Sequence, residues 1–461
     1  MALSAFQGSC RMLRAAQDDK LGGYYFVTPS VSDLAGFATG RGLAVGLKGI
    51  GKTAAYRHLS EFDRKTPDVT VGIDSDRYSL YLSDRDLKTD ACRKQFKHDI
   101  IIEALRAFGA SHDSVKKRPN ANFVKAANTQ VESYAALLKK AGARMQGFSI
   151  SVLGCGFTLP VGTSAVAVGL RAGKDVDSAL DTLKAICDSD VKIRIVIDDP
   201  ENVFSATNKL DVPLVGGLCL AALELSQLIP NLKVIVLLKT HVYYPVLSRV
   251  DDLHDYPDHM ARLSWDTEGL ESAVSNRLKW SGTKWADVFS GGEASGRSLI
   301  KAMCQSIRNG PRDLLRWIDL SLQSEAETKI SKNTVDKTRT ILSRHCLGEL
   351  ESAHADLYPG IGEVLKIVFR SKGNHKFKLS ELKEHIKTLL VKDREMIAAW
   401  KVRWMQGVTA SMLPDLLFKV GALALWMGPQ IVLPYEEGYR SANFESCSHV
   451  SLVPALIDAL Q

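Results

Sequence analysis

Hydrophobic and polar positions follow two different patterns along this chain. In the first 265 residues, short apolar runs such as VTVGI (69–73) and VKIRIVI (191–197) are separated by stretches in which apolar residues recur every three or four positions. Short apolar runs predict buried strands, and the longer period predicts amphipathic helices. Strands that alternate with helices predict an α/β fold, in which a parallel sheet is covered by helices on both faces.

The elements of this first region can be placed along the chain from the same pattern. Besides the strands, we expect a β-hairpin over 148–160, where small and apolar residues alternate. We expect helices over about 91–109, 123–143, 176–188 and 213–228.

The pattern changes after residue 266. Four successive segments between 267 and 353 show helical apolar spacing without a buried strand, which predicts a helical lid subdomain. Beyond Pro359 we expect a helix over 361–370, a strand at the start of KFKLSELKEHIKTLL, and helices over 380–390 with Ser380 as N-cap, 392–406 and 411–421. Two short strands, ALWMG and IVLPY, follow, an order that favours a winged helix. We therefore predict a P-loop αβα core over 1–265, a lid over 266–355 and a winged-helix domain over 356–461.

Composition narrows the class of protein. Of the 461 residues, 45% are hydrophobic and 24% are charged, which is near the globular average. No apolar stretch approaches the ~18 residues of a membrane span. The first residues lack the basic start followed by an apolar block that is typical of a signal peptide. The eight cysteines never form C-x-x-C, so we expect reduced thiols and a cytoplasmic protein without membrane contact.

The net charge of +7 is concentrated in one segment. Residues 366–403 hold eleven Lys or Arg and four Asp or Glu, a net +7 that equals the charge of the whole chain. A uniformly basic coat protein is therefore excluded. The segment could contact nucleic-acid phosphates, or it could be a solvated face or a protein-contact surface, and the sequence leaves these alternatives open.

Residues 46–53, GLKGIGKT, fit the pattern G-x-x-x-x-G-K-[ST] between a strand and a helix. Glycines let successive backbone N–H groups face a phosphate, the lysine pairs with β- and γ-phosphates, and the hydroxyl ligates Mg²⁺. The motif predicts that this segment binds ATP and Mg²⁺. The expected nucleotide-binding residues are Gly46, Lys48, Gly49, Ile50, Gly51, Lys52, Thr53 and Ala54, with Thr53 also a metal ligand.

An apolar strand ends in two acids, Asp198 and Asp199. We expect Asp198 to hold Mg²⁺, and Asp199, with Glu201 in reserve, to orient or deprotonate the attacking water. An ordinary helix-capping Asp is the alternative for such a strand end.

Further candidates lie at the next strand end and in the lid. Thr240 is the first candidate to lie beside the γ-phosphate, and Lys239 is the second. Arg312 at the start of a lid helix is expected to reach the same phosphate. Arginine fingers acting on a neighbouring subunit could come from Arg249, Arg262 or Arg277, although each could equally be an ordinary solvated or ion-paired side chain.

Taken in order, these motifs resemble a known family. The form G-x-K-G-x-G-K-[ST]-A, the strand ending in Asp-Asp, the polar strand end, LSWDTEGLESAVSNRL and NGPRDLL are similar to AAA+-related ATPases of the STAND and origin-initiator kind. They resemble in particular bacterial P-loop ATPases, several of them linked to phage-defence islands. The resemblance implies an αβα ATPase core, a helical lid carrying Arg312, a winged helix, and ATP-dependent switching or oligomerisation.

The sequence also departs from that family. The 146 residues from Lys52 to Asp198 exceed what one strand–helix pair needs, which implies an insertion over about 80–165. Lys239 and His241 stand where the family often has Arg and an acid. Since no nuclease, protease or similar effector sequence is evident, a defence role would require a separate effector protein.

Three functional hypotheses follow. The first is an ATPase that acts as a nucleotide-dependent switch or oligomerising module, through self-association or a separate effector. The second is a DNA-transaction ATPase whose basic winged helix contacts DNA through 366–403. The third is a scaffold that binds nucleotide and hydrolyses it very slowly.

Overall fold

The computed structural model contains two compact units, which are described separately. It describes residues 2–12, 15–63, 67–73, 88–111, 121–142, 150–152, 155–157, 173–200, 212–256, 258–307, 310–324, 329–355, 358–370, 376–392, 404–428, 430–433, 444 and 447–460. The sheet unit consists of Val27–Gly46 and Lys52–Leu263, and the helical unit consists of Met1–Phe26, Leu47–Gly51 and Ser264–Gln461. The segment 47–51 therefore groups with the helical unit, although its neighbours on both sides belong to the sheet unit.

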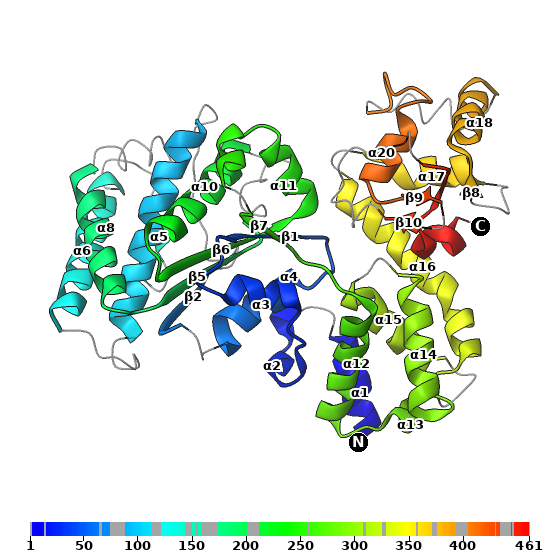
Figure 1. Ribbon diagram of the computed structural model, residues 1–461, viewed down its shortest axis with the longest axis horizontal. Coiled ribbons are helices and arrows are strands. Elements are labelled where there is room, and N and C mark those ends of the chain that lie inside the picture. The colour runs from blue at the N-terminus through cyan, green and yellow to red at the C-terminus, as the bar shows by residue number, and fades with distance from the viewer. Residues whose placement is uncertain are drawn as a thin grey trace. The chain divides into compact units, whose positions relative to one another are not determined.

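A five-stranded parallel sheet forms the centre of the sheet unit (Figure 1). Its order is β2-β5-β6-β1-β7. Strand β6 therefore lies between β1, which precedes the glycine-rich segment 46–53 (the glycine loop), and β5, which ends in Asp198. The expected parallel α/β sheet is confirmed. The strands are β1 Leu43–Gly46, β2 Val69–Ile73, β5 Ile193–Asp198, β6 Leu232–Lys239 and β7 Met260–Arg262.

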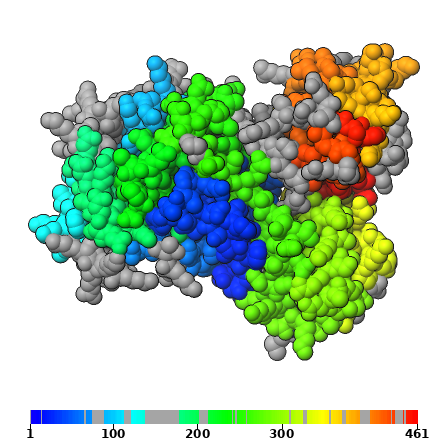
Figure 2. All heavy atoms as spheres, viewed as in Figure 1, coloured from blue at the N-terminus to red at the C-terminus, as the bar shows by residue number. Residues whose placement is uncertain are grey.

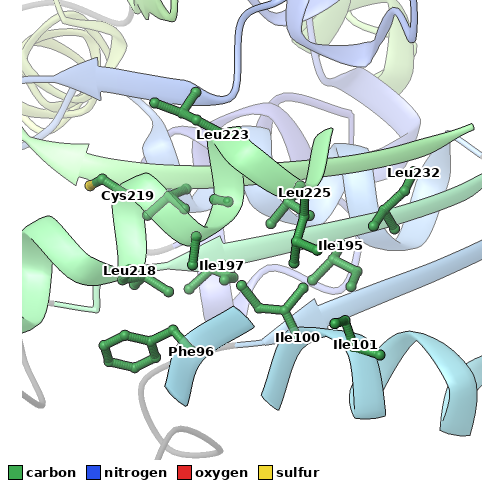
Figure 3. Packing of buried hydrophobic residues seen from close by; sticks show 14 of the residues in the cluster. Phe96, Ile100, Ile101, Ile195, Ile197, Leu218, Cys219, Leu223, Leu225 and Leu232 are labelled. Carbon is green, nitrogen blue, oxygen red and sulfur yellow. The ribbon is translucent and has the colours of Figure 1, made fainter. Parts of the chain in front are cut away.

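Two long helices cover one face of this sheet. Apolar side chains of α5 (Thr89–Ser111) and α10 (Val212–Leu228) pack over β5 and β6, as Figure 3 shows for Phe96, Ile195 and Leu218. Helices α6 (Ala121–Gly142) and α8 (Gly173–Asp188) pack beside α5. Because α5 contributes to the main core, the first part of the predicted insertion is one of the layers of the sandwich.

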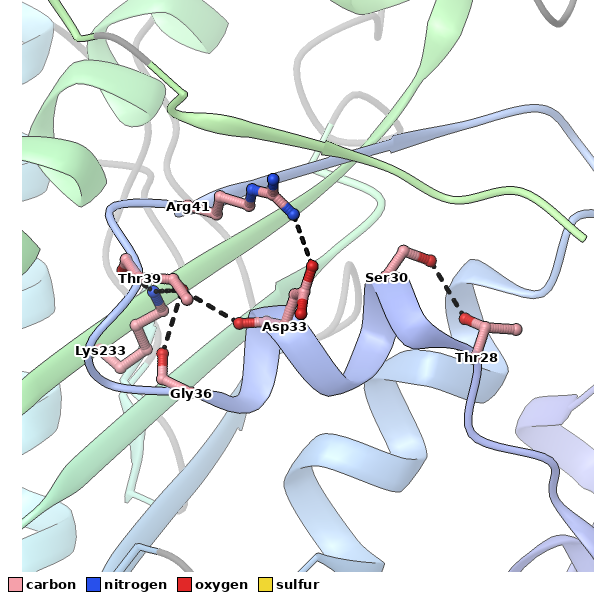
Figure 4. A network of polar contacts seen from close by, with 7 residues as sticks. All are labelled: Thr28, Ser30, Asp33, Gly36, Thr39, Arg41 and Lys233. Atoms are coloured by element: carbon pink, nitrogen blue, oxygen red, sulfur yellow. Dashed lines mark hydrogen bonds and ion pairs between the residues drawn. The ribbon is translucent and has the colours of Figure 1, made fainter.

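The opposite face of the sheet is covered by α3 (Pro29–Ala35) and by α4 (Lys52–Arg57), which continues as the π-helical turn η2 (His58–Phe62). Buried cations lie under this cover. Lys233 donates to the backbone oxygen and the hydroxyl of Thr39, at 2.6 and 3.2 Å (Figure 4). Its register partner Arg194 donates to Asp63 at 2.9 Å and to the carbonyls of Ala35 and Leu59. These bonds fasten α3 and η2 to the sheet.

The remaining elements of the sheet unit are short. The hairpin β3 (Ile150–Val152) and β4 (Cys155–Phe157) is antiparallel, as expected. Helix α11 (Thr240–Leu247) and the 3₁₀ turn η4 (Asp251–Asp255) follow β6.

The helical unit begins with the N-terminal segment of the chain. Helix α1 (Ala2–Arg11) packs on α12 and α15, and α2 (Leu21–Tyr24) packs on α12, so these residues join the predicted lid rather than the sheet. Arg11 forms an ion pair with Asp319 at 2.9 Å. The other helices here are η1 Ala15–Gln17, α12 Thr267–Ser281, α13 Trp285–Val288, α14 Gly292–Cys304, α15 Pro311–Leu322 and α16 Lys332–His354.

The C-terminal part of this unit combines helices with a small antiparallel sheet of order β10-β9-β11-β8. In the space-filling view the C-terminal residues, coloured orange to red, lie next to one another (Figure 2). Its assignment to the winged-helix class stays a prediction. The elements are α17 Ile361–Phe369, β8 Lys376–Phe377, α18 Leu379–Lys392, α20 Leu413–Lys419, β9 Leu423–Met427, β10 Gln430–Val432, β11 His449–Leu452 and η6 Pro454–Ala459.

Two local expectations in this part differ from the structure. Ser380 is not the N-cap of α18, because the helix begins at Leu379 and the Glu381 carboxylate accepts from the Lys378 N–H at 3.1 Å. Strand β11, with the sequence HVSL, was not among the expected elements. The helix expected over 392–406 falls largely outside the described residues.

None of the helices in the described ranges combines the length and the apolar character that crossing a bilayer requires.

Candidate functional site

The glycine loop lies between β1 and α4, as its sequence predicts. Gly49 and Gly51 have φ angles of +90° and +101°, a region that side-chain-bearing residues rarely adopt. The Ile50 N–H donates to the Leu47 carbonyl at 3.3 Å, which closes a turn between them. The shape of the loop therefore requires glycine at positions 49 and 51.

Lys52 is the first residue of α4, and it is buried, with 6% of its surface exposed. Its ammonium group donates to the Gly46 carbonyl at 3.1 Å, so the side chain folds back over the start of the loop. Thr53 and Ala54 follow in the first helical turn and are half-buried, whereas Lys48 is exposed.

Acidic and basic groups gather where β5 and β6 end. Asp198 is the last residue of β5 and is 5% exposed. Asp199 follows with a φ of +46°, a left-handed conformation that Asp tolerates better than most residues. Lys239, the last residue of β6, places its ammonium group 3.8 Å from an Asp199 carboxylate oxygen, and Thr240 is buried at the start of α11.

Strand register connects these groups to the glycine loop. Gly46, whose carbonyl accepts from Lys52, is the register partner of Lys239 in the parallel pair β1–β6. Lys52, Gly46, Lys239 and Asp199 therefore form one contiguous series at the carboxyl edge of the sheet, the edge at which open α/β sheets bind ligands. Glu201 and Asn309 lie outside the described residues.

Within the helical unit, the start of α15 covers the glycine loop. A Cβ atom built on Gly49 would lie 3.5 Å from Cδ and 3.8 Å from Nε of Arg312. One built on Gly310 would lie 3.3 Å from the Gly49 carbonyl oxygen. Pro311 at the first position of α15 fixes the helix start, and Arg312 is half-buried against the loop. The structure thus places the predicted Arg312 beside the loop.

Trp265 also contacts the loop. It lies in the segment LSWDTEGLESAVSNRL, which contributes to the sequence resemblance, but no role was predicted for this residue. Its indole N–H donates to the Ile50 carbonyl at 2.7 Å, and the side chain is 9% exposed. An apolar-looking residue before a helix normally predicts packing, so this polar contact could not be read from the pattern.

The residues at the sheet edge suit a magnesium–phosphate ligand. Mg²⁺ in phosphoryl-transfer sites takes one or two protein oxygens and completes its shell with phosphates and water. Thr53 and Asp198 offer such a hydroxyl and carboxylate. In the ranges that the structure describes, no cluster of three or more His, Cys, Asp or Glu forms an all-protein metal site.

The arginine-finger candidates are placed very differently. Arg277 is 7% exposed, its guanidinium lies 4.4 Å from the centre of the Tyr24 ring, and it donates to the Ala273 carbonyl. Arg277 as a finger is therefore wrong, because a guanidinium enclosed in its own unit cannot reach a neighbouring subunit. Arg249 is exposed and Arg262 is half-buried on the edge strand β7.

Comparison with known proteins gives likenesses of fold only. No protein-family model and no curated protein matches the chain. Among solved structures, a Walker-type ATPase of Pyrococcus abyssi is 12% identical with a TM-score of 0.41, covering 89% of this chain and 94% of that one. The Aeropyrum pernix ORC2 protein in ADPNP–ADP complexes is 11% identical with a TM-score of 0.41, covering 96% and 97%. Cdc6p of Pyrobaculum aerophilum is 13% identical with a TM-score of 0.34, covering 96% of each chain.

Proposed function

We propose that this protein is an AAA+-like P-loop ATPase that acts as a nucleotide-dependent switch or oligomerising module. The observation that supports this most is the contiguous series at the sheet edge. Lys52 folds onto Gly46, Gly46 is the register partner of Lys239, and Lys239 lies 3.8 Å from Asp199. A glycine loop, a lysine and strand-end acids are the parts that phosphoryl transfer requires.

The loop would bind the phosphates of ATP. Backbone N–H groups between Lys48 and Ala54, other than that of Ile50, would face phosphate oxygens, which the left-handed Gly49 and Gly51 permit. The Lys52 ammonium would exchange its bond to the Gly46 carbonyl for the β- and γ-phosphates. Thr53 and Asp198 would hold Mg²⁺, which neutralises charge developing on the phosphates.

Hydrolysis would use Asp199. A water oxygen bonds to the γ-phosphorus while the bond to the bridging oxygen breaks, and this releases ADP and phosphate. Asp199 would accept a hydrogen bond from that water and hold it in line, with Lys239 balancing the negative charge. Glu201 is the reserve candidate for the same role.

Switching requires groups that distinguish ATP from ADP. Thr240 begins α11 directly after β6 at the same edge, and Arg312 lies against Gly49, so each would bond the γ-phosphate and be released when it leaves. The finer biological role, a STAND-type switch in anti-phage defence acting through self-association or a separate effector protein, is part of the proposal and rests on the sequence resemblance.

The primary experiment is calorimetric titration with Mg-ATP. Lys52→Ala should abolish binding, whereas Lys94→Ala, an exposed lysine on α5, should bind as the wild type does. Asp199→Asn should bind ATP but release phosphate more slowly. Unchanged affinity in Lys52→Ala would refute the proposed site, and equally slow phosphate release in Asp199→Asn and wild type would favour the scaffold hypothesis.

The partner also needs an experiment. Mass measurement with and without ATP tests self-association. Lys378 and Lys387 are exposed on the segment 366–403, where nucleic acid would bind. DNA affinity that falls steeply with salt would support that alternative, and no DNA binding at low salt would exclude it.

A further inference from the structure

Trp265 forms the only indole bond to the glycine loop among the described residues. Its N–H donates to the Ile50 carbonyl at 2.7 Å, within the helical unit to which both residues belong. Ile50 itself is 5% exposed, so this carbonyl has little access to water. A buried carbonyl needs a donor, and loss of that donor costs more than an exposed hydrogen bond would.

The bond controls the direction of the next backbone N–H. In a trans peptide the carbonyl of one residue and the N–H of the next point in opposite directions. Since Trp265 holds the Ile50 carbonyl on one side, the Gly51 N–H points to the other side. A carbonyl that accepts a hydrogen bond also polarises its peptide, which strengthens the N–H as a donor.

The indole is itself held in place. The Trp265 ring lies 5.9 Å from the Phe26 ring, centre to centre. A Cβ atom on Gly269 would lie 3.5 Å from the Trp265 ring and 2.9 Å from the Asp266 carboxylate, so this part of α12 packs closely on the indole. Asp266 in turn caps α12, accepting from the Gly269 N–H at 2.6 Å.

We propose that Trp265 is a positioning residue for phosphate binding, which turns the Gly51 N–H toward the phosphates and ties the start of α12 to the loop. This inference rests on the proposed function, because it assumes that the loop binds phosphate. It adds a residue outside the glycine motif, on a different element, that sets the loop for its ligand. When a phosphate accepts a hydrogen bond from the Gly51 N–H, the same peptide unit stays bonded to Trp265 through the Ile50 carbonyl. A shift of this peptide is therefore transmitted to Trp265 and to the capped start of α12.

The test removes the indole N–H and keeps an aromatic side chain at position 265. Trp265→Phe should weaken binding of Mg-ATP and of inorganic tripolyphosphate by the same factor, about tenfold. Benzothienylalanine at position 265, which replaces the N–H by sulfur at nearly unchanged shape, should give the same loss if the bond rather than packing is responsible.

A matched control is Trp317→Phe. Trp317 is also buried, and its N–H donates to the Val335 carbonyl and the Thr338 hydroxyl in the same unit. This variant should lose thermal stability while keeping wild-type affinity for tripolyphosphate.

A spectroscopic readout separates positioning from general damage. In protein with ¹⁵N-labelled tryptophan, the indole N–H signal that disappears in Trp265→Phe should shift when tripolyphosphate is added. Wild-type affinity in both position-265 variants, or an indole signal that stays in place at saturation, would overturn the inference and leave the proposed function intact. Wild-type protein that binds neither ATP nor tripolyphosphate would instead overturn the proposed function.

Discussion

The glycine loop is anchored differently on its two sides. In the sheet unit, its flanking residues Gly46 and Lys52 are set by strand register and by a charged side chain bonded to a carbonyl. In the helical unit, residues 47–51 are set by close glycine packing, Arg312 and an indole N–H. Polar contacts of the sheet unit therefore hold the residues that flank the loop, whereas packing in the helical unit holds the backbone of 47–51.

The same contrast applies to buried cations. Arg194 and Lys233 are register partners in the sheet, and their charges are met by Asp63 and by backbone oxygens. In the helical unit, Arg277 lies on the Tyr24 ring instead. Burial lowers the pKa of both arginines and lowers that of Lys233 to about 8. Both cations of the sheet take their oxygens from α3, η2 and the residues that follow these elements, whereas Arg277 combines the Tyr24 ring with a carbonyl of its own helix.

The largest expected effect comes from removing the hydrogen bonds of the buried Arg194 in the sheet unit. Arg194→Met leaves Asp63 without that arginine and removes the donor of two carbonyls, so we expect the free energy of unfolding to fall by about 3–5 kcal/mol. Arg277→Met, which loses mainly a ring contact, should cost about 1–2 kcal/mol. Chemical denaturation of both variants measures this, and equal losses would contradict the distinction.

The second effect is a pH dependence that belongs to Lys233. Its folded-state pKa is about 8, below the ordinary 10.5 of lysine, because burial disfavours the charged form. The unfolded state then binds more protons between pH 8 and 10.5, so stability rises with pH across this window, by up to about 3 kcal/mol. The difference in unfolding free energy between wild type and Lys233→Met should change by that amount from pH 8 to 10.5. A constant difference would show that Lys233 keeps its ordinary pKa.

The third prediction tests the shape of the loop. Gly51→Val places a β-branched residue at a φ of +101°, so we expect about 2 kcal/mol less nucleotide binding energy, a loss of about 30-fold in affinity. Gly348→Ala in α16, where a Cβ meets nothing within 4 Å, should leave affinity unchanged and add about 1 kcal/mol of stability. Titration calorimetry and thermal melting give both values, and a Val variant that binds normally would exclude a role for this backbone conformation.

The smallest effect concerns the difference in affinity between ATP and ADP that Arg312 of the helical unit would produce. Arg312→Ala should weaken ATP about tenfold and leave ADP unchanged, because only ATP carries the γ-phosphate that the guanidinium would contact. Arg316→Ala is the control, since this arginine of α15 pairs with Glu349 of α16. Equal loss for ATP and ADP in Arg312→Ala would assign the residue to loop packing.

The local parts of the site follow from sequence with little ambiguity. A strand, a loop with two glycines, a lysine and a helix are contiguous in the chain, and their conformations depend on nearest neighbours. Asp198 and Thr240 were placed at strand ends by the same reasoning, since apolar runs stop there. Roles for these residues in catalysis stay predictions.

Contacts between distant segments were not predictable in the same way. The N-terminal helix α1 joins α12 and α15, more than 250 residues away in the chain, because its buried face fits theirs. The position of Arg277 in its helix is compatible with either an exposed or a buried side chain. The structure shows that it is buried against the Tyr24 ring. Helix α5 was expected within an insertion, yet its apolar face completes the main core.

Sequence by itself thus determined the order of strands and helices and the chemistry carried at the strand ends, since periodicity and motif spacing are local properties. Tertiary structure alone decided which strands neighbour each other, that Gly46 lies opposite Lys239, and that the Trp265 indole bonds to the Ile50 carbonyl. The physical reason is that side-chain direction and strand register are fixed by the burial of whole faces, which sums contributions from residues far apart in the chain.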